Sequence, residues 1–194
     1  PEIYRKLESQ KKTFNLIYFG NYFKNDSGLE SVFSALKRLD KKIKLILLGT
    51  DKSGGYFKKL ISDMNLKDRI IIIRRVPHQL MPEVATYAKI GIIPTPGNNS
   101  LSRFYSLPNK LLESMAIGLP IICTNIPEHQ KLLAGSGSSK LYDYCNDLKA
   151  TNEIIDHVKS INDQYSNFKK NADKISNQFS TDAEYDNTFA FLFK

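Results

Sequence analysis

The hydrophobic residues of this chain form short runs that alternate with longer amphipathic stretches. Each run is rich in Ile, Leu, Val, Phe or Tyr and is bounded by glycine, proline or polar residues, which is typical of buried strands. These runs cover residues 14–20, 43–49, 70–73, 89–94, 120–124 and 140–142. Between them, apolar residues recur every three or four positions, which predicts helices. The expected helices cover residues 29–39, 56–64, 78–88, 108–118, 127–133, 147–160 and 161–179, with a last helix starting near residue 182.

Strands that alternate with helices of this length predict an α/β fold, a Rossmann-like parallel sheet with helices on both faces. Ligands of such sheets bind at the carboxyl ends of the strands. Residues at these ends include Gly20, Gly49, Val76, Pro94 and Thr124. We therefore expect the functional site along this edge.

Two helix starts carry a capping-box pattern, Ser27 to Glu30 and Thr181 to Glu184, in which a hydroxyl and a carboxylate close free N–H groups. The first belongs to a strand–glycine–loop–helix unit of the kind that holds phosphate at a helix N-terminus. The loop from Thr95 to Leu107 is long for an α/β connection, and loops of this length are often functional.

Composition narrows the class of protein. A chain of 194 residues with 41% hydrophobic and 25% charged residues fits one soluble globular domain. Cys123 and Cys145 match no zinc or redox spacing, and Cys123 falls inside an expected strand, so a buried free thiol in a reducing compartment is expected. No apolar run approaches the ~20 residues of a membrane span, and the N-terminus lacks the apolar centre of a signal peptide.

The formal net charge is +8. The lysines are scattered and are not interleaved with stacking aromatic residues, so nucleic acid is not an expected partner. An anionic substrate or an acidic membrane surface would still gain from this charge.

The most informative segment runs from Pro108 to Thr124. Proline suits the first position of a helix, and Gly118 followed by Pro120 ends it. Asn109, Lys110 and Glu113 lie three or four positions apart and so share a polar face near the helix start. An amide, a cation and a carboxylate above a buried strand indicate a ligand site.

This segment, PNKLLESMAIGLPIICTNIPE, resembles the signature of the group 1 retaining glycosyltransferases, in the donor-binding, C-terminal half of the GT-B fold. The resemblance extends from about Phe14 to Asp147 and covers only the second half of such an enzyme. It implies that Glu113 accepts hydrogen bonds from the ribose hydroxyls of a nucleotide-sugar, since a carboxylate can accept two at once.

The chain differs from most members of the family at the positions that bind the diphosphate of the donor. Most relatives have an arginine after the first-strand glycine, Gly20, and a lysine before the next helix, where this chain has Asn21 and Ser27. We expect Lys110, with Arg103 as a second candidate, to replace the lost charge beside the helix that begins near Gly28.

The family's first glutamate is also replaced, because the matching position holds Tyr105. Tyr105, Asn98 and Asn99 are candidate substitutes for contacts to sugar hydroxyls, although ordinary turn residues explain the asparagines equally well. Sub-branches that make bacterial surface polysaccharides, such as O-antigen or capsule, show the same Pro-x-Lys form without the first acid, and this chain is most similar to them.

The resemblance further implies a base-binding position at Val76 and Pro77. His78 and His129 begin expected helices, where capping or surface roles are expected rather than catalysis. No catalytic residue is assigned in this half. No Asp-x-Asp motif occurs, in keeping with metal-independent transfer without a cofactor.

The expected function is donor binding, with a UDP-sugar as the donor, in a hexosyl- or N-acetylhexosaminyltransferase. The acceptor is then a lipid-linked saccharide held by the missing N-terminal domain, in the cytoplasm or peripherally at the cytoplasmic face of the inner membrane. A non-enzymatic Rossmann-type binding module is the alternative. The hypothesis of a dinucleotide-binding oxidoreductase is weaker, because residues 20–28 contain no Gly-x-Gly-x-x-Gly motif.

Three segments follow from this interpretation. Residues 1–12 are a linker or a remnant left by cloning, and residues 13–160 form the nucleotide-sugar-binding domain. Residues 161–194 are helices that pack back toward the missing domain. Because only one half of the site is present, we expect this chain alone to be inactive.

Overall fold

The computed structural model describes residues 7–8, 13–25, 27–74, 76–96, 101–105 and 108–178. Their strands form one parallel sheet in the order β3-β2-β1-β4-β5-β6. The strands are β1 (Asn15–Phe23), β2 (Lys44–Asp51), β3 (Ile70–Ile73), β4 (Ile90–Ile93), β5 (Ile121–Thr124) and β6 (Ser139–Tyr142). The Rossmann-like α/β fold expected from the hydrophobic runs is confirmed.

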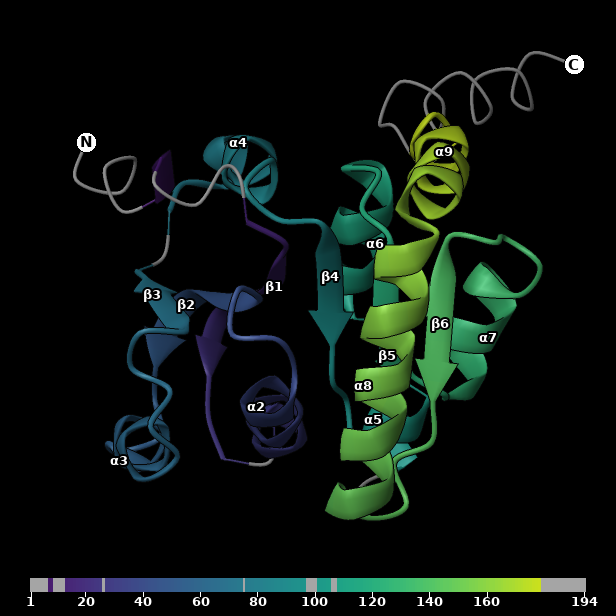
Figure 1. Ribbon diagram of the computed structural model, residues 1–194. Helices are drawn as coiled ribbons and strands as arrows, with labels where there is room; N and C mark the ends of the chain where they lie inside the picture. The colour runs from purple at the N-terminus through teal and green to yellow at the C-terminus, as the bar shows by residue number, and fades with distance from the viewer. Residues whose placement is uncertain are drawn as a thin grey trace, which may run out of the picture.

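Helices cover both faces of this sheet (Figure 1). They are α2 (Leu29–Arg38), α3 (Tyr56–Asp63), η1 (His78–Leu80), α4 (Met81–Ala85), α5 (Leu101–Phe104), α6 (Asn109–Ala116), α7 (Pro127–Leu133), α8 (Asp147–Asp163) and α9 (Tyr165–Ser176). Buried side chains of α2, α3 and α8 pack on one face, together with Leu16 and Tyr18 of β1. Those of α4, and of α6 and α7, pack on the other face, where Ile17 and Phe19 of β1 point.

The pairing of β1 with its two neighbours is unequal. β1 follows β2 along its whole length, with an irregularity between Phe19 and Tyr22. Beside the irregularity Gly49 has φ of 144°, and a Cβ there would lie 2.6 Å from the carbonyl oxygen of Gly20. In contrast, β1 and β4 pair only at Leu16 with Ile90 and at Ile17 with Gly91. The two central strands therefore separate toward their carboxyl ends.

Several expected bounds were wrong for identifiable reasons. β1 continues past Gly20 to Phe23, because the Phe23 ring is buried in the core and packs 5.9 Å from that of Phe57. The helix expected over residues 78–88 is a 3-10 turn followed by the short α4, after which Thr86, Tyr87 and Ala88 donate to carbonyls three residues back. The long loop after β4 contains the short helix α5.

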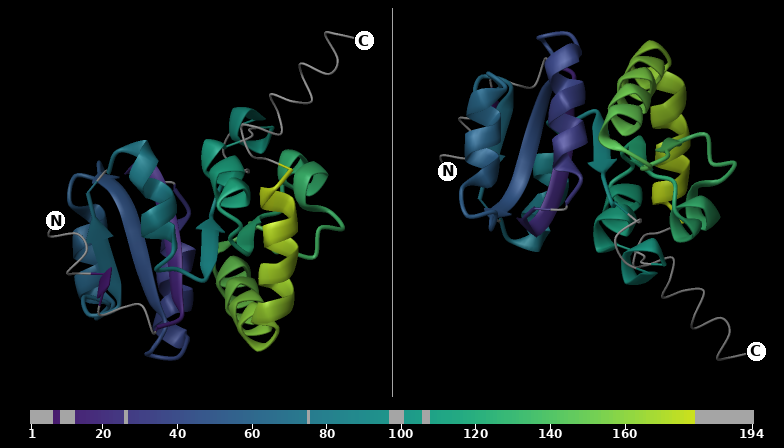
Figure 2. Two further views of the ribbon diagram at one scale, coloured as in Figure 1. Left: turned by 90° about the horizontal axis from the view of Figure 1, so that it is seen from above. Right: turned by 90° about the horizontal axis from the view of Figure 1, so that it is seen from below.

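The expected long helix over residues 161–179 was also wrong. α8 continues through residue 160 to Asp163, and the helix breaks at Gln164, whose φ is −117° and ψ 28°. α9 then lies beside α8 (Figure 2) and packs against α6, with the Lys169 ammonium 3.1 Å from the carbonyl oxygen of Gly118. That residues 161–194 also meet a further domain stays a prediction.

The structure tests one of the two expected capping boxes. At α2 the expectation was wrong, because the N-cap is Gly28, in a left-handed conformation, and the Ser27 hydroxyl makes no hydrogen bond within the described residues. The box from Thr181 to Glu184 lies outside the described residues. A cap not anticipated from the sequence occurs at α8, where the Asn146 side chain accepts a hydrogen bond of 2.8 Å from the amide of Lys149.

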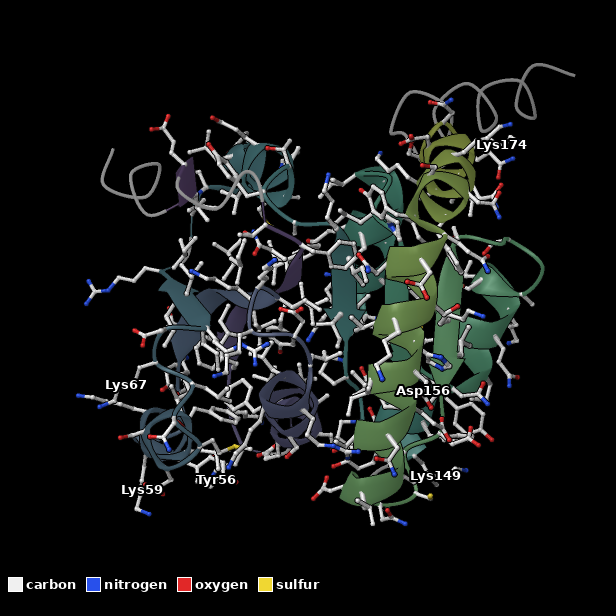
Figure 3. The ribbon with its side chains drawn as sticks, viewed as in Figure 1. Tyr56, Lys59, Lys67, Lys149, Asp156 and Lys174 are labelled. Atoms are coloured by element: carbon white, nitrogen blue, oxygen red, sulfur yellow. The ribbon has the colours of Figure 1, made fainter. Side chains whose placement is uncertain are left out.

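Basic side chains are dispersed over the surface. Figure 3 labels Lys59 on α3 and Lys67 in the turn before β3, which lie in one region, and Lys149 on α8 and Lys174 on α9, which lie far from them. Two of the four pair with neighbouring acids, Lys59 with Asp63 and Lys149 with Asp143. Such exposed pairs add little stability.

One arginine joins two connections at the amino edge of the sheet. The Arg69 guanidinium donates to the carbonyl oxygens of Leu39, Asp40 and Ile43 over distances of 2.6–3.2 Å. Burial lowers the pKa of Arg69, and the Asp40 charge opposes this effect. We expect Arg69→Met to reduce the free energy of unfolding by about 1–3 kcal/mol, because three carbonyls lose charged donors. Urea unfolding measures this loss.

The matched control is Lys67→Met, which removes a basic side chain that is exposed. Its effect should stay within about 0.5 kcal/mol. Equal losses in the two variants would show that the Arg69 hydrogen bonds contribute nothing specific.

Candidate functional site

The separation of β1 and β4 marks the point where the strand order reverses, and open α/β sheets bind ligands there. The connection after β1 leads to α2 on one face, and the connection after β4 leads to α6 on the other. The carboxyl ends of these strands therefore border an opening in the sheet. We call this region the central opening.

The N-terminus of α2 lies against the end of β4. A Cβ on Gly28 would meet Cβ of Pro94 at 2.9 Å and the Pro96 ring at 3.2 Å, and its φ is +76°. Only glycine fits this close approach without strain. The N-cap residue Gly28 has no side chain to cap α2, and within the described residues the buried Ser27 hydroxyl has no hydrogen-bond partner. The first N–H groups of this helix are therefore available to an acceptor.

Lys110 enters the central opening from the other side. Its ammonium lies 2.9 Å from the Tyr18 hydroxyl and 4.3 Å from the centre of the Tyr18 ring. Tyr18 belongs to the core under α2 and α8, whereas Leu111 of α6 belongs to the core on the opposite face. The contact thus crosses the plane of the sheet, which is possible because β1 and β4 have stopped pairing.

Lys110 lacks an acidic partner in the described part of the chain. The ion pairs there involve other lysines, whereas Lys110 is half-buried. A partly buried ammonium without a counter-ion is unfavourable, and an anionic ligand would compensate it.

Thr124, at the end of β5, connects the loop after β4 to α7. Its hydroxyl accepts a 2.7 Å hydrogen bond from the amide of Thr95, and its carbonyl lies 2.8 Å from Nδ1 of His129. A carbonyl can only accept, so Nδ1 carries the proton. This fixes where the residue 95–107 loop begins.

The surface or capping role expected for His129 was wrong, because the residue is fully buried. Burial lowers the pKa of His129; the Thr124 hydrogen bond opposes this shift, and the nearby Lys110 charge adds to it. The ring is therefore neutral near pH 7, and its bare Nε2 has no partner within the described residues. The His78 side chain lies outside what the structure describes.

The expected site residues differ in how far they are buried. Lys110 and Glu113 are half-buried on α6, while Asn109 and Tyr105 are exposed. Gly20 lies within β1, beyond the last residue that pairs with β4. These positions do not test the ligand roles expected for these residues, which stay predictions.

For the other expected site residues the predicted roles stay predictions, and several of them are not described. Val76 is buried in the core beside β3, whereas Pro77 is exposed. Asn98 and Asn99 lie outside the described residues, as do the side chains of Asn21 and Arg103.

Three residues at the site were missed, namely Tyr18, Thr124 as a hydrogen-bond centre, and His129. Tyr18 falls in an expected strand, where burial of its aromatic ring in the core is enough to explain a tyrosine. Nothing in the local sequence indicates that Lys110 lies next to it, 92 positions along the chain.

The described residues gather no group of three or more His, Cys, Asp or Glu side chains that could hold a metal ion. Metal independence stays a prediction. Within the same ranges, no helix combines the length and apolar character needed to cross a membrane.

Comparison with known proteins identifies the class of domain. The family model described as "Glycosyl transferases group 1" matches residues 1–175. No curated protein matches the chain.

Solved structures share the fold at low identity. Sucrose-phosphate synthase from Thermosynechococcus elongatus is 17% identical with a TM-score of 0.76, over 99% of this chain and 48% of that one. Anabaena HepE in complex with UDP is 16% identical with a TM-score of 0.74, over 100% and 52%. WaaG, a glycosyltransferase involved in lipopolysaccharide biosynthesis, is 17% identical with a TM-score of 0.66, over 93% and 46%. The chain thus spans about half the length of these proteins.

The buried state of His129 predicts a pH effect. Since its pKa is lowered in the folded chain, the unfolded chain binds the proton more readily. The contribution of the neutral ring to stability is complete above the unfolded pKa of about 6.5 and is lost as the pH falls below it. We expect the unfolding free energy of the wild type, relative to His129→Asn, to be constant from about pH 7 to 8.5 and to decrease toward about pH 5.

Urea unfolding of both proteins at each pH gives this difference directly. The asparagine amide replaces the Nδ1 donor but does not titrate. A difference between the two proteins that is independent of pH would contradict a neutral, buried His129.

Proposed function

Because the chain belongs to the group 1 glycosyl transferases, we propose that it is the donor-binding half of a retaining enzyme that uses a UDP-sugar. The observation that carries this proposal is the half-buried Lys110 ammonium in the central opening, without an acidic partner in the described part of the chain. The uncapped start of α2 borders the same opening. Both features suit a diphosphate.

The chemistry follows from these charges. In the transfer, the bond from the anomeric carbon to the phosphate oxygen breaks, and the same carbon forms a bond to the acceptor hydroxyl oxygen, which loses its proton. Negative charge develops on the departing diphosphate. The Lys110 ammonium and the N–H groups at the start of α2 stabilise this charge. Glu113, one turn after Lys110, accepts hydrogen bonds from the ribose hydroxyls. No metal ion is required in this proposal.

UDP is the proposed nucleotide because HepE, a protein of the same fold, was solved with UDP and with UDP-glucose. The transferred group is a hexosyl or N-acetylhexosaminyl unit. The product is a bacterial surface polysaccharide such as O-antigen or capsule, built on a lipid-linked acceptor in the cytoplasm or at the cytoplasmic face of the inner membrane. The similarity to WaaG supports this assignment.

Calorimetry with UDP, uridine and NAD tests the donor assignment. We expect UDP to bind more tightly than uridine or NAD, because only UDP combines uridine with a terminal diphosphate. Lys110→Gln should weaken UDP by about 10-fold or more and leave uridine nearly unchanged. Glu113→Ala should weaken UDP and uridine equally, since both carry the ribose.

Salt gives an independent check on the same complex. The preference of the wild type for UDP over uridine should shrink as salt rises, because an accessible ion pair is screened. Equal affinity for UDP and uridine in the wild type would refute the diphosphate site. UDP binding without transfer by the full-length protein would favour a non-enzymatic binding module.

The length of the chain, compared with that of the solved structures, leads to a separate prediction. Since the chain spans about half of each, we expect it to bind donor without transferring sugar. Release of UDP from UDP-glucose in the presence of saccharide acceptors measures this. Sugar transfer catalysed by the chain alone would contradict the half-enzyme proposal.

A further inference from the structure

We propose that Tyr18 is a positioning residue, whose hydroxyl holds the Lys110 ammonium in the central opening for a diphosphate. This inference rests on the proposed function and adds to it a residue of β1 that precedes the opening. With 2% of its surface exposed, Tyr18 acts through Lys110 and does not touch the ligand.

The tyrosine is a rigid support. Its ring packs edge-on against Phe23 at 6.5 Å, and Phe23 packs against Phe57 at 5.9 Å. A lysine side chain, in contrast, has four flexible carbons and loses substantial rotamer entropy when it is fixed. The 2.9 Å hydrogen bond to a fixed hydroxyl offsets this loss of entropy in the free protein, so less of it remains to be lost when a ligand binds.

The contact leaves Lys110 able to bind an anion. An ammonium has three N–H groups, and the Tyr18 hydroxyl accepts one of them. The ring face, 4.3 Å away, attracts the cation without using another N–H group. Two donors thus remain for phosphate oxygens.

The hydroxyl itself has no role in packing. A phenylalanine at residue 18 would fill the same core position and retain the cation–π contact, without a polar atom to bury. The feature that distinguishes tyrosine here is its hydrogen bond to Lys110.

The chain provides a matched control in Tyr142. This tyrosine is 1% exposed, belongs to the same buried cluster, and has a hydroxyl without a hydrogen-bond partner in the described residues. Tyr142→Phe and Tyr18→Phe therefore remove the same atom from equally buried rings. Only one of these atoms bonds to Lys110.

The test is calorimetry of both variants with UDP and uridine, after thermal unfolding confirms that each is folded. Tyr18→Phe should weaken UDP by about 3- to 10-fold, with uridine unchanged, because a hydrogen bond of this kind is lost. Tyr142→Phe should change neither affinity. Equal weakening of UDP and uridine by Tyr18→Phe would overturn the proposal, since it would indicate a general structural effect.

A double-mutant cycle shows whether Tyr18 acts through Lys110. In the Lys110→Gln background, Tyr18→Phe should have little further effect on UDP. Fully additive losses would overturn the positioning role. If wild type binds UDP and Tyr18→Phe binds it equally well, only this inference fails. If wild type shows no preference for UDP over uridine, the proposed function fails with it.

Discussion

The early separation of β1 and β4 is the constraint on which the site depends. These strands pair at only two positions, Leu16 with Ile90 and Ile17 with Gly91, before their connections leave toward opposite faces. A continuous ladder here would close the sheet between the two helix layers. Lys110 would then have no route to Tyr18, and the site would lose the contact that locates its cation.

The electrostatics of the site follow from the same opening. A helix N-terminus without a side-chain cap and an ammonium without an acidic partner in the described residues border one space. The aromatic face of Tyr18 tolerates the cation but does not neutralise it. The buried His129 stays neutral nearby, so it adds no second charge. An ammonium and the positive end of a helix dipole therefore border this edge, and both favour an anionic ligand.

The sequence predicted the sheet well because buried parallel strands are continuous apolar runs, and such runs have few alternatives. Helix ends were less predictable. The Ser27 capping box was outweighed by the contact of Gly28 with Pro94, and the stripe after Ile161 continued through a break at Gln164. Periodicity reports which side chains are apolar, whereas caps and breaks depend on tertiary neighbours.

The candidate site was predictable only where a motif was local. Lys110 and Glu113 lie in one recognisable segment, so both could be proposed from the sequence. Tyr18 and His129 could not, because each owes its role to a partner on another element. A tyrosine in a strand and a histidine near a helix start have common structural explanations, and only the fold shows which contacts they make.

The proposed ligand of the opening between β1 and β4 is a nucleoside diphosphate. Titration of the isotope-labelled chain with UDP, followed by amide NMR shifts, tests this proposal most directly. We expect the largest shifts at Gly28, Leu29 and Lys110, where the start of α2 and the start of α6 meet the opening. Saturable shifts confined to another surface, such as α9 or the edge strand β3, with these amides unchanged, would contradict it.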